Sequence, residues 1–136
     1  MSSKRKGTRF ERELAHMFFD HNWGCVRVAG SGSTPMPAPD ILASNGKRVL
    51  AVECKGIKKT TKYLSNEDVE QLKKFSKKFG AEAWLGIRFD AIGWYFLELK
   101  DLKKSKKGYV IPLNLAKKDG LSFKELIGVY RQKRLR

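Results

Sequence analysis

The sequence predicts a single α/β domain with a central mixed β-sheet flanked by helices. Segments with apolar residues at helical spacing alternate with short runs of strand-forming residues. The resulting order of helix, three strands, helix, two strands and a late helix is typical of layered α/β domains. With 136 residues, of which 41% are hydrophobic, the chain is long enough for one core and too short for two.

The first expected element is a helix over residues 8–24. Its apolar residues recur at helical spacing (Phe10, Leu14, Met17 and Phe18). Thr8 followed by Glu11 matches the capping-box pattern, in which each side chain binds a backbone N–H of the other residue. Gly24 is the residue type that most often follows the end of a helix. The sequence therefore predicts that this helix starts at Thr8 and stops at Gly24.

Three short strands are expected next. Residues 25–29 form the first, and residues 30–39, which are rich in Gly, Ser and Pro, form a flexible loop after it. Residues 40–44 and 47–55 are strand-like runs on either side of Asn45-Gly46, a dipeptide typical of tight hairpin turns. We therefore expect these two strands to pair with each other.

The second half of the chain repeats the alternation of helix and strand. Residues 65–79 read as an amphipathic helix with one apolar side (Val69, Leu72, Phe75 and Phe79). Residues 82–89 and 93–99 are expected strands, and residues 122–130 a shorter helix. We expect residues 1–136 to form one domain, with flexible basic ends at 1–7 and 131–136.

The charge balance indicates the class of partner. The chain has 29 Lys and Arg against 14 Asp and Glu, a net charge of +15, which favours a polyanion as partner. Nucleic acid is the first candidate and an anionic membrane surface the second. No apolar run approaches the roughly 20 residues of a spanning helix, and the basic N-terminus lacks the apolar stretch of a signal peptide. Cys25 and Cys54 are too few for a disulfide framework or a zinc site, as expected in a reducing cytoplasm.

Three charged residues, Asp40, Glu53 and Lys55, lie at or near the ends of the apolar runs 41–43 and 49–52. Strand alternation places Glu53 and Lys55 on one face, roughly 7 Å apart, and hairpin pairing brings Asp40 close to Glu53. Two adjacent carboxylates repel each other unless a cation relieves them, and Mg²⁺ prefers such oxygen ligands. A lysine beside the metal can orient or help to deprotonate a water molecule and stabilise a crowded phosphate transition state. The pattern predicts metal-assisted hydrolysis of a phosphodiester.

Each of these residues also has a structural explanation. Glu53 and Lys55 could form a salt bridge on a half-exposed strand, and Asp40 could simply follow Pro39 in a turn. Against this, the strand is apolar on both faces before Glu53, where another Val would have served a structural purpose better.

The spacing of these residues resembles a known nuclease signature. Pro39-Asp40, twelve residues, and then Glu53-Cys54-Lys55 match the PD-(D/E)xK pattern. Together with "RKGTRFERE", "VRVAGSGS", "PDILA", "VECK" and "FSKKFG", the chain is similar to the archaeal Holliday-junction resolvase family, Hjc. The similarity covers most of the chain in the same order and thins after Glu98. It implies a restriction-endonuclease-like fold.

The resemblance also implies a function. Members are structure-selective endonucleases that resolve four-way DNA junctions by paired nicks, act as homodimers, and require Mg²⁺, for which Mn²⁺ is an expected substitute. Asp40, Glu53 and the Cys54 backbone carbonyl correspond to metal ligands, and Lys55 corresponds to the catalytic lysine. Glu11 corresponds to a helix-borne catalytic acid that completes the metal site. Ser31 lies in the loop where the family has a functional serine.

Basic residues around this site are candidate phosphate contacts. Arg12 and Arg27 match basic positions of the family. Two charged segments flank the presumed site and are expected to bind DNA without reading its sequence (Lys4, Arg5, Lys6 and Arg9; Lys58, Lys59 and Lys62). The run from Lys103 to Lys107 is either a further contact or a solvated loop.

Other assignments stay open at the sequence level. Glu11 lies at the edge of the apolar stripe, whereas Glu13 leans to the other edge, where Arg9 offers an ordinary ion pair. His16 and His21 are expected on the surface. Several large apolar residues are candidates for a dimer interface or for ordinary core (Phe75, Phe79, Phe89, Trp94 and Phe96).

Two other functions compete with junction resolution. One is a general repair or restriction-like nuclease that cuts duplex or flap DNA. The other is a non-catalytic basic module that binds nucleic acid, whose acidic residues only balance local charge.

Overall fold

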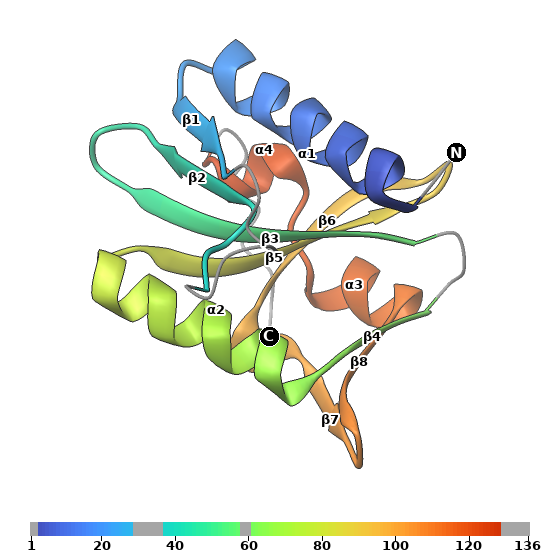
Figure 1. Ribbon diagram of the computed structural model, residues 1–136. Helices are drawn as coiled ribbons and strands as arrows, with labels where there is room; N and C mark the ends of the chain where they lie inside the picture. Colours follow the sequence, from blue (N-terminus) through green and yellow to red (C-terminus); the bar gives the residue numbers. More distant parts are fainter. Residues whose placement is uncertain (1–2, 29–36, 58–60, 129–136) are drawn as a thin grey trace.

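The computed structural model describes residues 3–28, 37–57 and 61–128, and for 3–8, 57 and 61–63 only the backbone. A five-stranded sheet has the order β1-β2-β3-β5-β6. Helices α1 (Ser3–Asp20) and α2 (Asn66–Phe79) lie on opposite faces of this sheet (Figure 1). The strands are β1 (Gly24–Arg27), β2 (Ile41–Ser44), β3 (Val49–Ile57), β5 (Glu82–Phe89) and β6 (Gly93–Glu98). Neighbouring strands are antiparallel except β3 and β5, which confirms the predicted mixed sheet.

Helix α1 has different ends from those predicted. It begins at Ser3, so Thr8 lies inside the helix and the predicted capping box there is wrong. The helix stops at Asp20, and Asn22 has a left-handed backbone with φ of 66°. The N–H groups of Asn22 and Trp23 bind the carbonyls of Phe19 and Phe18, both at 3.0 Å, and the Trp23 and Phe18 rings are in contact. This is a Schellman ending, and Asn22 supplies the conformation expected of Gly24.

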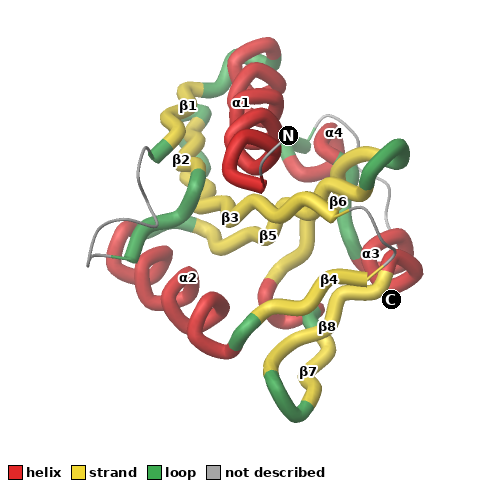
Figure 2. Tube along the Cα trace, turned by 45° about the vertical axis from the view of Figure 1, so that its right-hand side comes forward, coloured by secondary structure: helices red, strands yellow, loops and turns green. Residues whose placement is uncertain are grey.

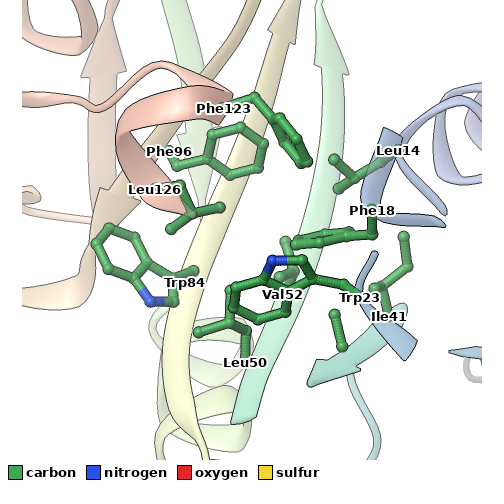
Figure 3. Packing of buried hydrophobic residues seen from close by; sticks show 11 residues of the cluster. Leu14, Phe18, Trp23, Ile41, Leu50, Val52, Trp84, Phe96, Phe123 and Leu126 are labelled. Carbon is green, nitrogen blue, oxygen red and sulfur yellow. The ribbon is translucent and has the colours of Figure 1, made fainter. Parts of the chain in front are cut away.

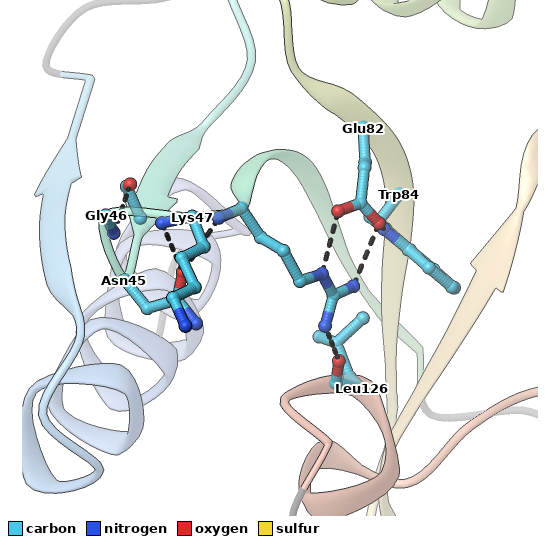
Figure 4. A network of polar contacts seen from close by, with 8 residues as sticks. Asn45, Gly46, Lys47, Glu82, Trp84 and Leu126 are labelled. Carbon is cyan, nitrogen blue, oxygen red and sulfur yellow. Dashed lines mark hydrogen bonds and ion pairs between the residues drawn. The ribbon is translucent and has the colours of Figure 1, made fainter.

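The hairpin between β2 and β3 forms as predicted, with a turn shifted by one residue. Ser44 pairs with Val49, and the Asn45 N–H binds the Arg48 carbonyl at 3.2 Å, so Gly46 and Lys47 are the central residues. Gly46 has φ of 91°, which glycine adopts without steric cost. The Asn45 side chain accepts hydrogen bonds from the N–H groups of Lys47 and Arg48 (Figure 4). Asn45 therefore stabilises the turn through its side chain.

The next elements agree closely with the sequence. Ser65 caps α2 by accepting a hydrogen bond from the Asp68 N–H at 3.0 Å, and Gly80 ends it with φ of 72°. Strand β5 spans residues 82–89, as predicted, and β6 ends one residue early, at Glu98.

A second, three-stranded sheet was not predicted. Its order is β4-β8-β7, with β4 (Thr61–Leu64), β7 (Lys103–Ser105) and β8 (Gly108–Pro112), and Figure 2 shows it apart from the five-stranded sheet. The run from Lys103 to Lys107 therefore forms the first strand and the turn of a hairpin. The interpretation of this run as a loop is wrong. A short 3₁₀ turn (Leu99–Asp101) and helices α3 (Leu113–Asp119) and α4 (Phe123–Leu126) complete the described chain. Helix α4 begins with a capping box between Ser122 and Glu125.

The core has two parts, one on each face of the five-stranded sheet. The part beneath α1 and α4 includes Leu14, Phe18, Leu50, Val52 and Phe123 (Figure 3). The part facing α2 includes Ala51, Val69, Leu72, Leu85 and Ile87. Because β3 lies in the middle of the sheet, Leu50, Ala51 and Val52 are all fully buried. This explains why the strand is apolar on both faces before Glu53.

The five candidate interface residues divide between core and surface. Phe89 and Phe96 are buried core residues, and the partly buried Trp94 ring stacks on Phe96. Phe79 is 55% exposed and stacks on Phe75 at 5.3 Å between ring centroids. Only the Phe75–Phe79 pair thus retains the surface position that an interface requires. Among the described residues, no helix is long and apolar enough to cross a membrane.

Candidate active site

Asp40 lies immediately before β2 and is held there by bonds to residues of the neighbouring chain segments. Extending the pairing of Ile41 with Val52 by one residue sets Asp40 opposite Glu53. The carboxylate oxygen Oδ2 of Asp40 accepts a hydrogen bond from the Cys54 N–H at 2.8 Å. The backbone carbonyl of Asp40 accepts another from the Val28 N–H, also at 2.8 Å. These bonds place the Asp40 carboxylate beside β3, as the hairpin predicted.

Glu53 and Asp40 form a close pair of carboxylates. Burial, a hydrogen bond with Asp40 and the charge of Asp40 raise the pKa of Glu53 to about 9, while Lys55 opposes the shift. The Oε1 atom of Glu53 is buried and has no hydrogen-bond partner among the described residues. Adjacent carboxylates fit a hard cation such as Mg²⁺, which binds oxygen ligands and removes the repulsion.

The backbone of Cys54 suits the role implied for it. Its N–H points to Asp40, and in an extended strand the N–H and C=O of one residue point to the same side. We therefore expect the Cys54 carbonyl on the Asp40 side of β3. The thiol packs with the core beneath α1, away from Glu53, which interacts with α2.

Glu11 approaches this pair from α1. Burial and the charge of Asp40 raise the pKa of Glu11, whereas Arg27 and Lys55 lower it. Charged groups of α1, β1, β2 and β3 are therefore near enough to interact. In the described parts of the chain, however, no three His, Cys, Asp or Glu side chains gather closely enough to hold a metal. The role of Glu11 as a further ligand stays a prediction.

Glu13 has a different main partner from the one predicted. Its Oε1 accepts hydrogen bonds from Arg88 Nε and Trp94 Nε1, both at 2.7 Å. Although burial raises the pKa of Glu13, these hydrogen bonds and the charges of Arg88 and Arg9 lower it overall. Arg88 also lies over the Phe10 ring, 4.7 Å from its centroid. Glu13 therefore fixes α1 to β5 and β6, through partners that local spacing could not reveal.

The remaining predicted site residues are placed unevenly. Lys55 lies on β3, and its charge acts on both Glu53 and Glu11. Arg9 and Arg12 are exposed on α1, and Arg27 is half-buried at the end of β1. The side chains of Lys4, Arg5, Lys6 and Lys62 are not described, and Ser31, Lys58 and Lys59 lie outside the described residues. His16 and His21 are exposed, as predicted, and His21 Nδ1 is 2.8 Å from the Met17 carbonyl.

One acidic residue near the site was missed. The negative charge of Asp68, in the first turn of α2, also raises the pKa of Glu53. This effect is smaller than the increases caused by burial and Asp40 and the decrease caused by Lys55. In the sequence, Asp68 is only one of the acidic residues at the start of an expected helix. Such residues are usually explained by their favourable interaction with the helix dipole.

Comparison with known proteins shows similarity over nearly the whole chain. The family described as "Archaeal holliday junction resolvase (hjc)" matches residues 2–135. The Crossover junction endodeoxyribonuclease Hjc of Archaeoglobus fulgidus is 40% identical over 131 residues, covering 96% of both chains. The protein of the same name from Methanocaldococcus jannaschii is 35% identical over 128 residues, covering 94% of this chain and 91% of its own.

A solved structure agrees with these matches. The structure of Archaeoglobus fulgidus Hjc, described as a Holliday junction resolvase from an archaeal hyperthermophile, has a TM-score of 0.83 and 38% identity. The similarity covers 89% of this chain and 98% of that one. The restriction-endonuclease-like fold implied by the resemblance is confirmed. This chain belongs to the archaeal Holliday junction resolvase family, Hjc.

Proposed function

We propose that this chain is a structure-selective endonuclease that resolves four-way DNA junctions by paired nicks. The observation that carries the proposal is the close pair of Asp40 and buried Glu53, with Lys55 on the same strand. The relatives named crossover junction endodeoxyribonucleases support the choice of substrate. The alternatives are a nuclease that cuts duplex DNA and a non-catalytic DNA-binding module, and a cleavage assay distinguishes them from a junction resolvase.

The proposal includes a Mg²⁺ ion, with Mn²⁺ as a substitute. Asp40, Glu53 and the Cys54 carbonyl would hold it, and Glu11 would complete the site. The close pair of Asp40 and Glu53 carboxylates and the all-oxygen donor set support this assignment. When bound, Mg²⁺ supplies positive charge that stabilises developing negative charge on the phosphate and lowers the pKa of water.

Lys55 orients the attacking water in this proposal. The water oxygen forms a bond to phosphorus and loses a proton, the bond from phosphorus to one sugar oxygen breaks, and that oxygen takes up a proton, so that the exchange balances. The products are a phosphate monoester and a free hydroxyl group. The positive charge of Lys55, close to Glu53 and Glu11, stabilises the extra negative charge of the transition state.

Paired nicks require two sites, which a two-fold dimer provides with one small chain. The exposed Phe79 and its stacking partner Phe75 support an interface on the outer side of α2. The net charge of +15 supports extensive contact with DNA phosphates.

A cleavage assay tests the function. An end-labelled four-way junction and the matching linear duplex are incubated with the protein in Mg²⁺ or in chelator, and products are separated on a denaturing gel. We expect paired nicks in the junction alone, and only with metal. Equal cutting of the duplex would overturn the junction assignment, and binding without cutting would overturn the enzyme.

The variant Asp40→Asn ties the activity to this site. We expect cleavage to fall more than about 100-fold, since even residues that only orient a metal ligand are worth about 10–100-fold. Junction binding should be kept or strengthened, because a negative charge beside phosphate is removed. Asp20→Asn, at the exposed end of α1, is the matched control and should cleave normally. Normal nicking by Asp40→Asn would refute the assignment.

A further inference from the structure

A small cavity lies against Glu53 between β3 and α2. Its volume is about 20 Å³, and three parts of the chain enclose it (Ala38 and Pro39, Glu53, and Asp68, Gln71 and Leu72). A cavity needs roughly 10–15 Å³ to hold one water molecule. The space is therefore large enough for a water.

The polar groups around the cavity suit such a water. Among the described residues, Glu53 Oε1 is buried and lacks a hydrogen-bond partner, so its hydrogen bond with Asp40 is assigned to the other carboxylate oxygen. Asp68 is close enough for its charge to act on Glu53. Gln71 binds Glu67 through Nε2 at 3.2 Å, and its amide has a second N–H and a carbonyl oxygen. A water can donate to both carboxylates at once, and a buried water usually has 2–4 polar partners.

Two of the residues that line the cavity are buried, and the helix that carries Asp68 and Gln71 has a capped start. Leu72 is buried in the core facing α2, and Pro39 is buried ahead of Asp40. The Asp68 N–H is held by the Ser65 side chain at 3.0 Å, which fixes the first turn of α2. The side chains of Asp68 and Gln71 are thus presented to Glu53 from an anchored helix.

We propose that Asp68, assisted by Gln71, is a positioning residue for Glu53 that holds one water molecule against its Oε1. This inference rests on the proposed function. The water fixes the Glu53 carboxylate so that its other oxygen faces Asp40, where both carboxylates would hold the metal. Asp68 also adds negative charge that attracts a doubly charged cation to the site.

Metal binding by DNA-free protein is the direct test. Mg²⁺ and Mn²⁺ affinities are measured by calorimetry for the wild type and Asp68→Ala, with Glu70→Ala as the matched control. Glu70 is an exposed acidic residue of α2 that does not line the cavity. We expect Asp68→Ala to bind both metals about 10–100-fold more weakly, and Glu70→Ala to match the wild type. In cleavage assays, Asp68→Ala should need correspondingly more Mg²⁺ but reach within about 3-fold of the normal rate at saturation.

The near-isosteric variant Asp68→Asn separates the water from the charge. Its amide oxygen still accepts a hydrogen bond from water, so we expect it to lose less affinity than Asp68→Ala. Equal losses in both variants would refute the role of the water. Equal affinity of Asp68→Ala and Glu70→Ala would overturn the whole inference. A wild-type protein that neither binds metal nor cuts junctions would instead overturn the proposed function.

Discussion

At Glu53, burial and charge conflict strongly. Its pKa of about 9 in the folded protein lies far above the ordinary value of 4.5. Between these pH values the folded state binds a proton that the unfolded state has released. The contribution of Glu53 to stability is therefore fully present below pH 4.5 and is lost as the pH rises through 9.

The variant Glu53→Gln should remove this pH dependence. In metal-free buffer we expect it to melt above the wild type, by a margin that grows from pH 5 to pH 9. Even one unit of pKa difference corresponds to about 1.4 kcal/mol. Thermal melts followed by circular dichroism measure the margin. Adding Mg²⁺ should reverse it, because only the wild type gains binding free energy. A constant margin across the pH range would contradict the role of Glu53.

Among the elements, the start of β3 is tied to two distant segments by Arg48. Its guanidinium binds both Glu82 carboxylate oxygens at 2.8 Å and donates to the Leu126 carbonyl at 2.7 Å (Figure 4). It also lies 5.9 Å from the Trp23 ring centroid. The hairpin, β5 and α4 therefore meet at one side chain, at the opposite end of β3 from Lys55.

Replacing this side chain should cost stability without affecting the active site. We expect Arg48→Met to lower the free energy of unfolding by about 1–2 kcal/mol, since charged hydrogen bonds are lost but the pair is partly exposed. Urea denaturation measures the change. Lys100→Met is the control, because Lys100 pairs with Glu98 but is 68% exposed, and it should cost less than about 0.5 kcal/mol. Equal effects of the two variants would show that the contacts of Arg48 with Glu82 and Leu126 do not stabilise the fold.

Elements with local signals were predictable from sequence, and those that depend on distant partners were not. Helix α2 has a capping serine, an apolar side and a terminal glycine, all within its own segment. Strands β4 and β7 are only four and three residues long, and they are strands because β8 pairs with both. The candidate site followed the same rule. Asp40 and Glu53 meet through a local hairpin, whereas Arg88 and Asp68 reach the neighbourhood of the site only through tertiary packing.

At the scale of the whole molecule, the proposed dimer would bury the exposed side chain of Phe79 in the interface. We expect Phe79→Glu to produce monomers, because a charge would be buried in an apolar interface. Phe19→Glu is the matched control, since Phe19 is 74% exposed on α1, and it should remain dimeric. Sedimentation velocity distinguishes the two. The Phe79→Glu protein should also lose the pairing of nicks. A wild-type protein that sediments as a monomer would refute the proposal.

The parallel pairing of β3 with β5 has a consequence for synthesis of the protein. Glu11, Asp40, Glu53 and Lys55 all lie before residue 60, but the strand beside β3 begins only at Glu82. A nascent chain that has just emerged with all four residues therefore lacks the neighbour that completes the middle of its sheet. The candidate site is therefore fully supported only after α2 and β5 have also left the ribosome. We consequently expect truncated chains that end before β5 to lack cleavage activity.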